Sequence, residues 1–86
     1  MVSNKHWFLY VVRCNDGTLY TGITVDLGRR VNEHNTSNRG AKYTKARRPV
    51  VLTWSKDYNN RSEAQSAEYS FKKLSRKEKL DTIKNG

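Results

Sequence analysis

Residues 7–24, WFLYVVRCNDGTLYTGIT, decide the fold of this chain because two strand-like runs flank a turn signal. Trp7 to Cys14 and Leu19 to Thr24 are rich in the β-branched and aromatic residues that favour strands. Between them, Asn15-Asp16-Gly17 has the composition of a tight turn. The sequence therefore predicts a β-hairpin over this stretch.

The length of the hairpin loop determines whether Tyr10 and Tyr20 lie on the same face of the sheet. Side chains alternate along a strand, so a slip of one residue moves a side chain to the opposite face. A two-residue turn would separate the two phenols. A three-residue loop with Gly17 in a left-handed conformation pairs Tyr10 with Gly22 and brings both phenols to one face. We expect the three-residue loop, with Gly22 leaving space opposite Tyr10 for a ligand or another backbone. The opposite face would carry the core residues Trp7, Leu9, Val11, Leu19 and Ile23.

A helix is expected after the hairpin, because Asp26 is a good N-cap and Leu27, Val31 and His34 follow at helical spacing. Arg30 precedes His34 by four residues and lies on a neighbouring stripe. Residues 35–48 have almost no core-forming side chains and are expected to form a mobile basic loop.

The second half of the chain predicts one strand and two helices. Pro49 opens a strand over residues 50–56. A capping box of Ser62 with Gln65 is expected to start a long helix, and a box of Ser75 with Glu78 a short terminal one. The apolar residues of these helices are Ala64, Ala67, Phe71, Leu74, Leu80 and Ile83.

Composition limits the class of protein. The 86 residues have room for a single domain, residues 1–86, and 17 Lys and Arg against 8 Asp and Glu give a net charge of +9. A small domain with this much positive charge indicates a polyanionic partner. Nucleic acid is favoured over an anionic membrane, because the basic residues are interleaved with polar ones rather than facing an apolar stripe. No apolar run is long enough to span a membrane, and no apolar core follows residues 1–5 as in a signal peptide, so we expect a cytoplasmic protein. The lone Cys14 excludes an internal disulfide.

Glu68 stands out in the long helix because it lies at the margin of the apolar stripe. Such a carboxylate is usually turned to solvent, paired with a cationic side chain such as Lys72, or bound to a cation. Magnesium prefers carboxylate oxygen and retains several waters, so one carboxylate and a substrate phosphate can complete a site. The residues alone leave these alternatives open.

Taken together, these residues resemble the GIY-YIG nuclease superfamily, in particular its small stand-alone bacterial branch of YhbQ-like proteins. Phe8-Leu9-Tyr10 corresponds to the Gly-Ile-Tyr motif and Tyr20-Thr21-Gly22 to the Tyr-Ile-Gly motif, with only the tyrosines and last glycine retained. The run from Gly40 to Thr44 and Arg47-Arg48-Pro49 are also similar to this branch. Glu68 matches the family's metal-binding glutamate. Several members have an asparagine well beyond that glutamate, and the late candidate here is Asn85.

The resemblance implies an α+β fold, a three-stranded antiparallel sheet flanked by helices in the order ββαβαα. It also implies phosphodiester hydrolysis with one Mg²⁺ or Mn²⁺ ion held by Glu68. Arg30 would neutralise phosphoryl charge, Tyr10 or Tyr20 would orient or deprotonate water, and His34 would relay a proton or orient a neighbour. An ordinary helix-end histidine contacting terminal carbonyls is the alternative for His34. The expected nucleic-acid contacts are Lys42, Tyr43, Lys45, Arg47, Arg48 and Lys72, with Tyr43 able to stack on an unpaired base.

Three function hypotheses follow from these observations. The first is a metal-dependent DNA endonuclease or exonuclease with a preference for DNA structure, active in repair or processing, and with DNA a better candidate than RNA. The second is a non-catalytic nucleic-acid-binding module that keeps the fold and basic surface. The third is an interaction domain that docks onto a larger repair complex. A monomer or weak dimer is expected in each case.

Overall fold

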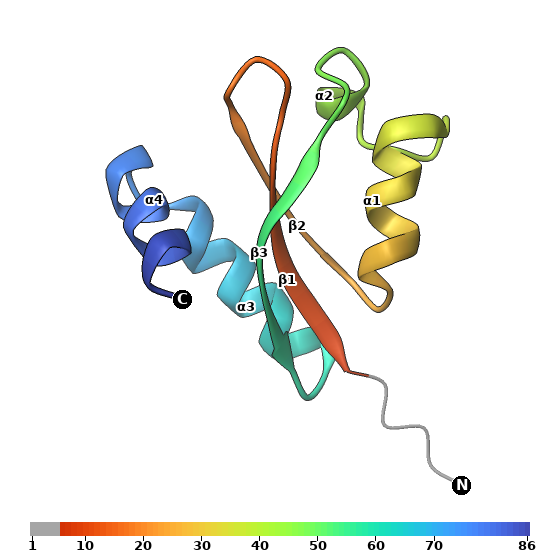
Figure 1. Cartoon of the computed structure of the whole chain (residues 1–86). Coiled ribbons are helices and arrows are strands. Elements are labelled where there is room, and N and C mark those ends of the chain that lie inside the picture. The colour runs from red at the N-terminus through yellow and green to blue at the C-terminus, as the bar shows by residue number, and fades with distance from the viewer. Residues whose placement is uncertain (1–5) are drawn as a thin grey trace, which may run out of the picture.

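The computed structural model of the chain describes residues 6–86, so the expectation about residues 1–5 lies outside the described part. A three-stranded sheet separates two groups of helices, α1 and α2 on one side and α3 and α4 on the other (Figure 1). This confirms the α+β architecture and the order of its main elements, with α2 as an added short helix. The elements are β1 (Trp7–Arg13), β2 (Leu19–Thr24), α1 (Leu27–Thr36), α2 (Lys42–Lys45), β3 (Val51–Tyr58), α3 (Arg61–Lys72) and α4 (Arg76–Asn85).

The hairpin has the predicted three-residue loop. The Cys14 amide donates to the Thr18 carbonyl at 2.8 Å, and Gly17 has φ 85°, a conformation that costs glycine little. Within β1 and β2, Tyr10 is therefore paired with Gly22, and the predicted register is confirmed. The antiparallel sheet has the strand order β2-β1-β3, which places Tyr10 on the central strand.

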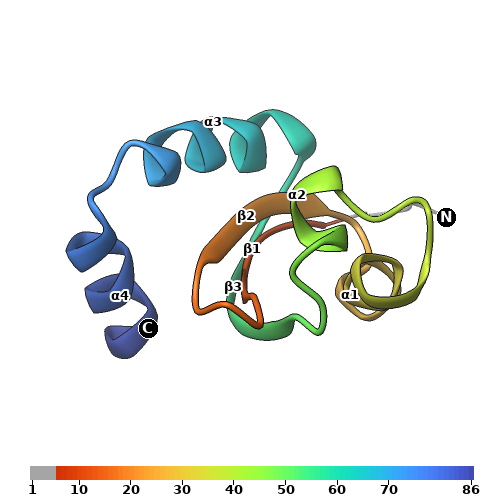
Figure 2. The same cartoon turned by 90° about the horizontal axis from the view of Figure 1, so that it is seen from above.

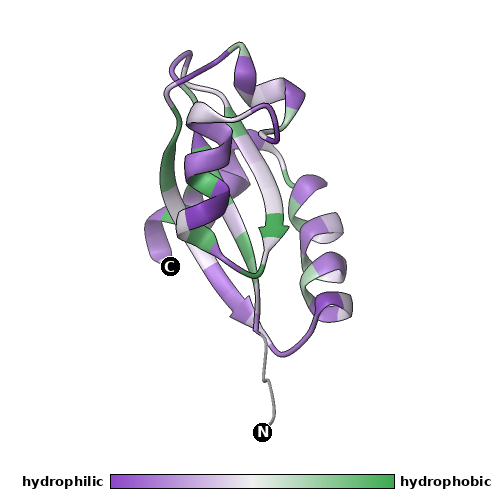
Figure 3. Ribbon diagram, turned by 90° about the vertical axis from the view of Figure 1, so that its right-hand side faces the viewer, coloured by the Kyte–Doolittle hydropathy of each residue, from purple (hydrophilic) through white to green (hydrophobic). Residues whose placement is uncertain are grey.

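Both faces of the central strand β1 are buried, because helices cover the sheet on each side, whereas β3 is largely exposed. On the Tyr10 face, α1 contributes Leu27 and Val31 to a cluster around Tyr10, Val12 and Val50. The opposite face packs against α3 and α4, as Figure 2 shows from above. Hydrophobic residues are concentrated along the strands, whereas the helices are mostly hydrophilic (Figure 3). The second cluster consists of Leu9, Val11 and Phe71 with Leu19, Ile23, Trp54, Tyr58, Ala67, Leu74 and Ile83, and does not include Trp7.

Residues 35–48 were expected to form a loop, and this expectation is wrong. Helix α1 continues to Thr36, α2 covers Lys42–Lys45, and Gly40 and Thr44 are buried. The segment is ordered by polar contacts rather than by apolar residues. In particular, the Arg48 guanidinium donates to the carbonyls of His34 and Ser37, each at 2.6 Å, and so satisfies the C-terminal end of α1.

Caps explain where most of the other helices begin. Asp26 accepts from the Arg29 amide at 3.0 Å, and the Ser75–Glu78 capping box is present at α4, as predicted. The predicted Ser62–Gln65 box is wrong. Asn60 is the N-cap of α3 and accepts from the Glu63 amide, because β3 runs two residues further than expected and the connection is short. None of the helices within residues 6–86 is long and apolar enough to cross a membrane.

Candidate active site

A buried hydrogen bond between Tyr10 and His34 forms the centre of the site. Tyr10 comes from β1 and His34 from the last turn of α1, and the phenol oxygen lies 2.7 Å from His34 Nε2. Tyr10 is 1% exposed and His34 is fully buried. Tyr20 packs edge-on against the imidazole, with ring centroids 5.2 Å apart. The two phenols and the imidazole predicted from the sequence therefore form one aromatic cluster, in which the Tyr10 and Tyr20 centroids are 6.5 Å apart.

Gly22 makes room for Tyr10 rather than for a ligand. A Cβ atom at Gly22 would lie 2.6 Å from the Tyr10 hydroxyl oxygen and 2.8 Å from the adjacent ring carbon. The space expected opposite Tyr10 is thus filled by the end of its own side chain. The glycine is required so that the phenol can cross β2 and reach His34.

Arg30 lies beside the Tyr10–His34 pair and is itself held in place. Its Nη1 atom donates to Glu33 Oε1 at 2.9 Å and to the Arg39 carbonyl at 2.8 Å. The side chain is 25% exposed, so one part of the guanidinium is anchored while another can meet solvent. A planar cation in this position can neutralise charge that develops on a phosphate.

Burial shifts the pKa values of the central pair in opposite directions. It raises the pKa of Tyr10 to about 12, and the nearby Arg30 guanidinium opposes this rise. Burial and the charge of Arg30 lower the pKa of His34 to about 4. At neutral pH the phenol is therefore protonated and the imidazole uncharged. His34 does not contact the terminal carbonyls of α1, because Arg48 takes that place.

Glu68 approaches the same cluster from α3. Its negative charge contributes to the raised pKa of Tyr10, which places it within electrostatic reach of the phenol. The carboxylate is 21% exposed and pairs with Lys72 at 3.2 Å, a contact that a cation can replace because Lys72 is mostly exposed.

The chemistry of Glu68 fits a magnesium ion that keeps most of its waters. Within residues 6–86 no group of three or more His, Cys, Asp or Glu side chains is arranged to hold a metal ion. A dedicated cage of protein ligands is thus absent from this part of the chain. One carboxylate together with a substrate phosphate is the arrangement that Mg²⁺ tolerates and that the family resemblance implies.

Four of the predicted nucleic-acid contacts already have partners within the protein. Arg48 donates to carbonyls at the end of α1, Lys72 pairs with Glu68, and Tyr43 and Arg47 contact each other. The Tyr43 ring stacks on Tyr20, with centroids 6.0 Å apart, and the Arg47 guanidinium lies 3.8 Å from the Tyr43 centroid. Arg47 also pairs with Asp16 in the hairpin loop at 3.0 Å. Tyr43 is enclosed between Tyr20 and Arg47, so a base could stack on it only by displacing one of them.

The lysines remain available for phosphate. Lys42 and Lys45 are exposed on α2, which lies beside β2 (Figure 2). A cleft of about 290 Å³ runs between β2, α2 and the other pair of helices, and Lys72 and Lys79 line it together with both aromatic rings of the Tyr20–Tyr43 stack. The cleft thus joins exposed lysines to Tyr20, which belongs to the aromatic cluster around His34.

Comparison with known proteins agrees with this geometry. The model of the GIY-YIG catalytic domain matches residues 6–81. The chain belongs to the GIY-YIG family. A UPF0213 protein of Streptococcus agalactiae is 53% identical over 77 residues, covering 90% of this chain and 86% of the relative. One of Staphylococcus epidermidis is 49% identical over 83 residues, covering 96% and 99%.

Two solved structures have the same GIY-YIG fold. The solution NMR structure of the Enterococcus protein EF2693, from E. faecalis, matches with a TM-score of 0.65 and 45% identity, covering 99% of this chain and 90% of that one. The UPF0213 protein BH0048 from Bacillus halodurans matches with a TM-score of 0.60 and 38% identity, covering 92% and 83%. The predicted membership of the superfamily and its small bacterial branch is confirmed.

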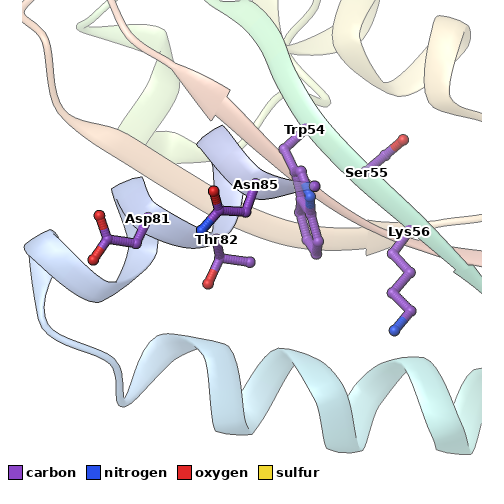
Figure 4. Close-up of a pocket in the computed structure, with 7 residues that line it drawn as sticks. Trp54, Ser55, Lys56, Asp81, Thr82 and Asn85 are labelled. Atoms are coloured by element: carbon purple, nitrogen blue, oxygen red, sulfur yellow. The ribbon is translucent and has the colours of Figure 1, made fainter.

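Asn85, the late asparagine considered in the GIY-YIG comparison, does not join the cluster. It lines a cavity of about 530 Å³ with Trp54, Lys56 and Asp81, at the contact between β3 and α4 (Figure 4). Trp54 belongs to the core on the face opposite Tyr10, where it stacks on Phe71. The sheet therefore separates Asn85 from the GIY-YIG motif tyrosines.

Sequence reasoning missed three residues of this GIY-YIG site. Glu33 anchors Arg30, and Ala41 and Thr44 contact His34 Nδ1 at 3.2 and 2.9 Å. The run from Gly40 to Thr44 was noted only for its similarity to the family. The sequence feature that could have identified these contacts is a set of small residues typical of buried positions, Gly40, Ala41 and Thr44, within an otherwise basic segment.

Proposed function

We propose that this chain is a divalent-metal-dependent nuclease that hydrolyses phosphodiester bonds in DNA. The observation that carries the proposal is the buried Tyr10–His34 hydrogen bond, with Arg30 beside it and Glu68 within electrostatic reach. Strongly shifted pKa values in such a cluster are typical of catalytic sites. Membership of the GIY-YIG family supports the same reaction.

Tyr10 is the proposed proton acceptor for the attacking water once its own hydroxyl proton has passed to solvent water, and His34 and Arg30, which both lie near its oxygen, would stabilise the resulting phenolate. Its pKa of about 12 means that the phenolate needs further stabilisation at neutral pH. Tyr20 is less buried and would orient the water or the phosphate. Arg30 would neutralise charge on the phosphoryl oxygens.

Glu68 would hold the divalent ion, and the chemistry supplied there is polarisation of the phosphate and stabilisation of the leaving oxygen. Lys72 would then be released from its pair with Glu68 and become free to contact phosphate. Lys42 and Lys45 would bind the backbone of the same strand. These lysines give affinity without sequence preference, so a particular DNA structure is the expected target.

The test compares the wild type with Glu68→Gln and with Glu63→Gln, a matched control on the first turn of the same helix. Each protein is incubated with labelled single-stranded, duplex, nicked and branched DNA and with RNA, in magnesium, manganese or chelator. We expect metal-dependent cleavage of DNA by the wild type and the control, and loss of cleavage with retained binding in Glu68→Gln. Metal-dependent cleavage by Glu68→Gln at the wild-type rate would refute the assigned metal ligand. Salt-sensitive binding without cleavage on every substrate would instead support the non-catalytic module.

A further inference from the structure

The imidazole of His34 is contacted at both ring nitrogens, and the two contacts determine where its proton lies. Nε2 faces the Tyr10 oxygen at 2.7 Å, whereas Nδ1 faces the Ala41 amide nitrogen at 3.2 Å and Thr44 Oγ1 at 2.9 Å. A backbone N–H can only donate, and its direction is fixed by the chain. Nδ1 therefore offers its lone pair to Ala41, which favours an unprotonated Nδ1.

Thr44 Oγ1 is the second polar atom within hydrogen-bond distance of Nδ1. The hydroxyl is completely buried and lies 2.8 Å from the Ala41 carbonyl and 2.9 Å from His34 Nδ1. The hydroxyl hydrogen can rotate to either acceptor, so Thr44 is compatible with an unprotonated Nδ1. The Thr44 amide also donates to the Ala41 carbonyl at 3.0 Å, and this bond fixes the peptide that precedes α2.

Gly40 allows this segment to approach α1 closely enough for the contact. A Cβ atom at Gly40 would lie 2.6 Å from the Glu33 carbonyl oxygen and 2.8 Å from the Cα atom of His34. Both neighbours are backbone atoms and cannot rotate away. Any larger residue would therefore push the Ala41 amide away from the imidazole.

We propose that Gly40, the Ala41 amide and Thr44 form a device that holds neutral His34 with its proton on Nε2, so that His34 donates a hydrogen bond to the Tyr10 oxygen. An N–H donor at the Tyr10 oxygen stabilises the phenolate form. In the neutral form, the Tyr10 hydroxyl hydrogen then points away from His34. The opposite tautomer would make His34 the acceptor and leave the Ala41 amide unsatisfied. The proton position is a property of the folded chain, whereas its benefit for cleavage rests on the proposed function.

Thr44 is thus a positioning residue that acts through His34. A relay of the Tyr10 proton through His34 towards Thr44 would end at the Ala41 carbonyl, which cannot take up a proton at neutral pH. The geometry therefore favours orientation over proton relay as the role of His34. Orientation of the Tyr10 oxygen is then the role of His34 within this proposal.

The test is long-range proton–nitrogen NMR of the His34 ring in the wild-type protein without DNA. We expect the nitrogen shifts of a neutral ring protonated at Nε2. A ring protonated at Nδ1 would overturn the proposal outright, whatever the protein does to DNA. A wild type that shows the Nε2 tautomer but cuts no substrate would contradict the proposed function and leave the tautomer assignment standing.

Variants separate positioning from packing. Thr44→Val removes the hydroxyl with little change in volume, and Thr44→Ser restores it. Thr82→Val is the control, because the Thr82 hydroxyl also bonds a helix carbonyl, at 3.0 Å, but lies on α4. We expect Thr44→Val to mix the two tautomers and to lower kcat about 10–100-fold, by analogy with the range found when the partner that orients a metal-ligating histidine is removed. Thr44→Ser should restore both measurements, and a Thr44→Val protein with unchanged tautomer and kcat would overturn the role of Thr44.

Discussion

The hydroxyl of Tyr10 occupies the volume that a side chain at Gly22 would need, with only 2.6 Å between Tyr10 Oη and an ideal Cβ at Gly22. The phenol cannot move aside freely, because His34 holds it by a buried hydrogen bond. The glycine of the second motif and the tyrosine of the first are therefore parts of one arrangement. This relationship gives the first prediction.

Gly22→Ala should displace the Tyr10 ring and break its contact with His34. We expect a loss of about 1–3 kcal/mol in the free energy of unfolding, as for other overpacked core positions, and a large loss of cleavage. Thermal unfolding and a cleavage assay would measure the two effects. Gly28→Ala is the control, since the nearest atom to its Cβ is 3.8 Å away, and equal effects of the two substitutions would contradict this explanation.

Arg48 and Lys45 should separate stability from nucleic-acid binding. Arg48 donates hydrogen bonds to carbonyls at the end of α1, so we expect Arg48→Met to lower the free energy of unfolding by about 1–3 kcal/mol.

Lys45 is exposed, so Lys45→Met should leave the melting temperature unchanged but weaken DNA binding and reduce its dependence on salt. Urea denaturation and binding titrations at several salt concentrations would test both. An Arg48→Met protein of wild-type stability would show that its contacts are not needed for the fold.

His34 should make stability depend on pH in the acidic range. Its pKa is lowered from 6.5 to about 4 in the folded protein, so the unfolded chain binds the extra proton first. The free energy of unfolding is therefore unaffected by His34 protonation above pH 6.5 and decreases as the pH falls towards 4, by a total on the order of 3 kcal/mol. Melting temperatures of the wild type and His34→Asn between these limits would test this. Parallel pH profiles of the two proteins would contradict it.

Tyr10 should ionise at a higher pH than a solvent-exposed tyrosine. Burial raises its pKa from 10.0 to about 12, so the folded state retains the proton that the unfolded chain loses. Its contribution to stability is therefore present below pH 10 and is lost as the pH rises towards 12. Ultraviolet absorbance of phenolate should show one of the 5 tyrosines titrating late, and Tyr10→Phe should remove that step. A wild-type titration identical to that of Tyr10→Phe would refute the assignment.

The hairpin and the main helices could be predicted from the sequence because their determinants are local. The Asn15-Asp16-Gly17 loop fixes the register that brings Tyr10 and Tyr20 to one face, and Asp26 caps α1 through a neighbour three residues away. Strand alternation and helical spacing also place Arg30, His34 and Glu68 on the correct elements. The family resemblance supplied their roles as expectations.

Only the tertiary structure decided what the polar groups contact. Tyr10 and His34 are 24 residues apart, and the Arg47–Asp16 pair spans 31 residues. No periodicity encodes such contacts, because they arise when the basic segment after α1 folds back against the helix. Residues 35–48 have too few apolar side chains to predict this, and buried hydrogen bonds order them instead. The sequence by itself thus determined which elements carry the candidate site residues, whereas long-range packing determined which groups these residues contact and how deeply they are buried.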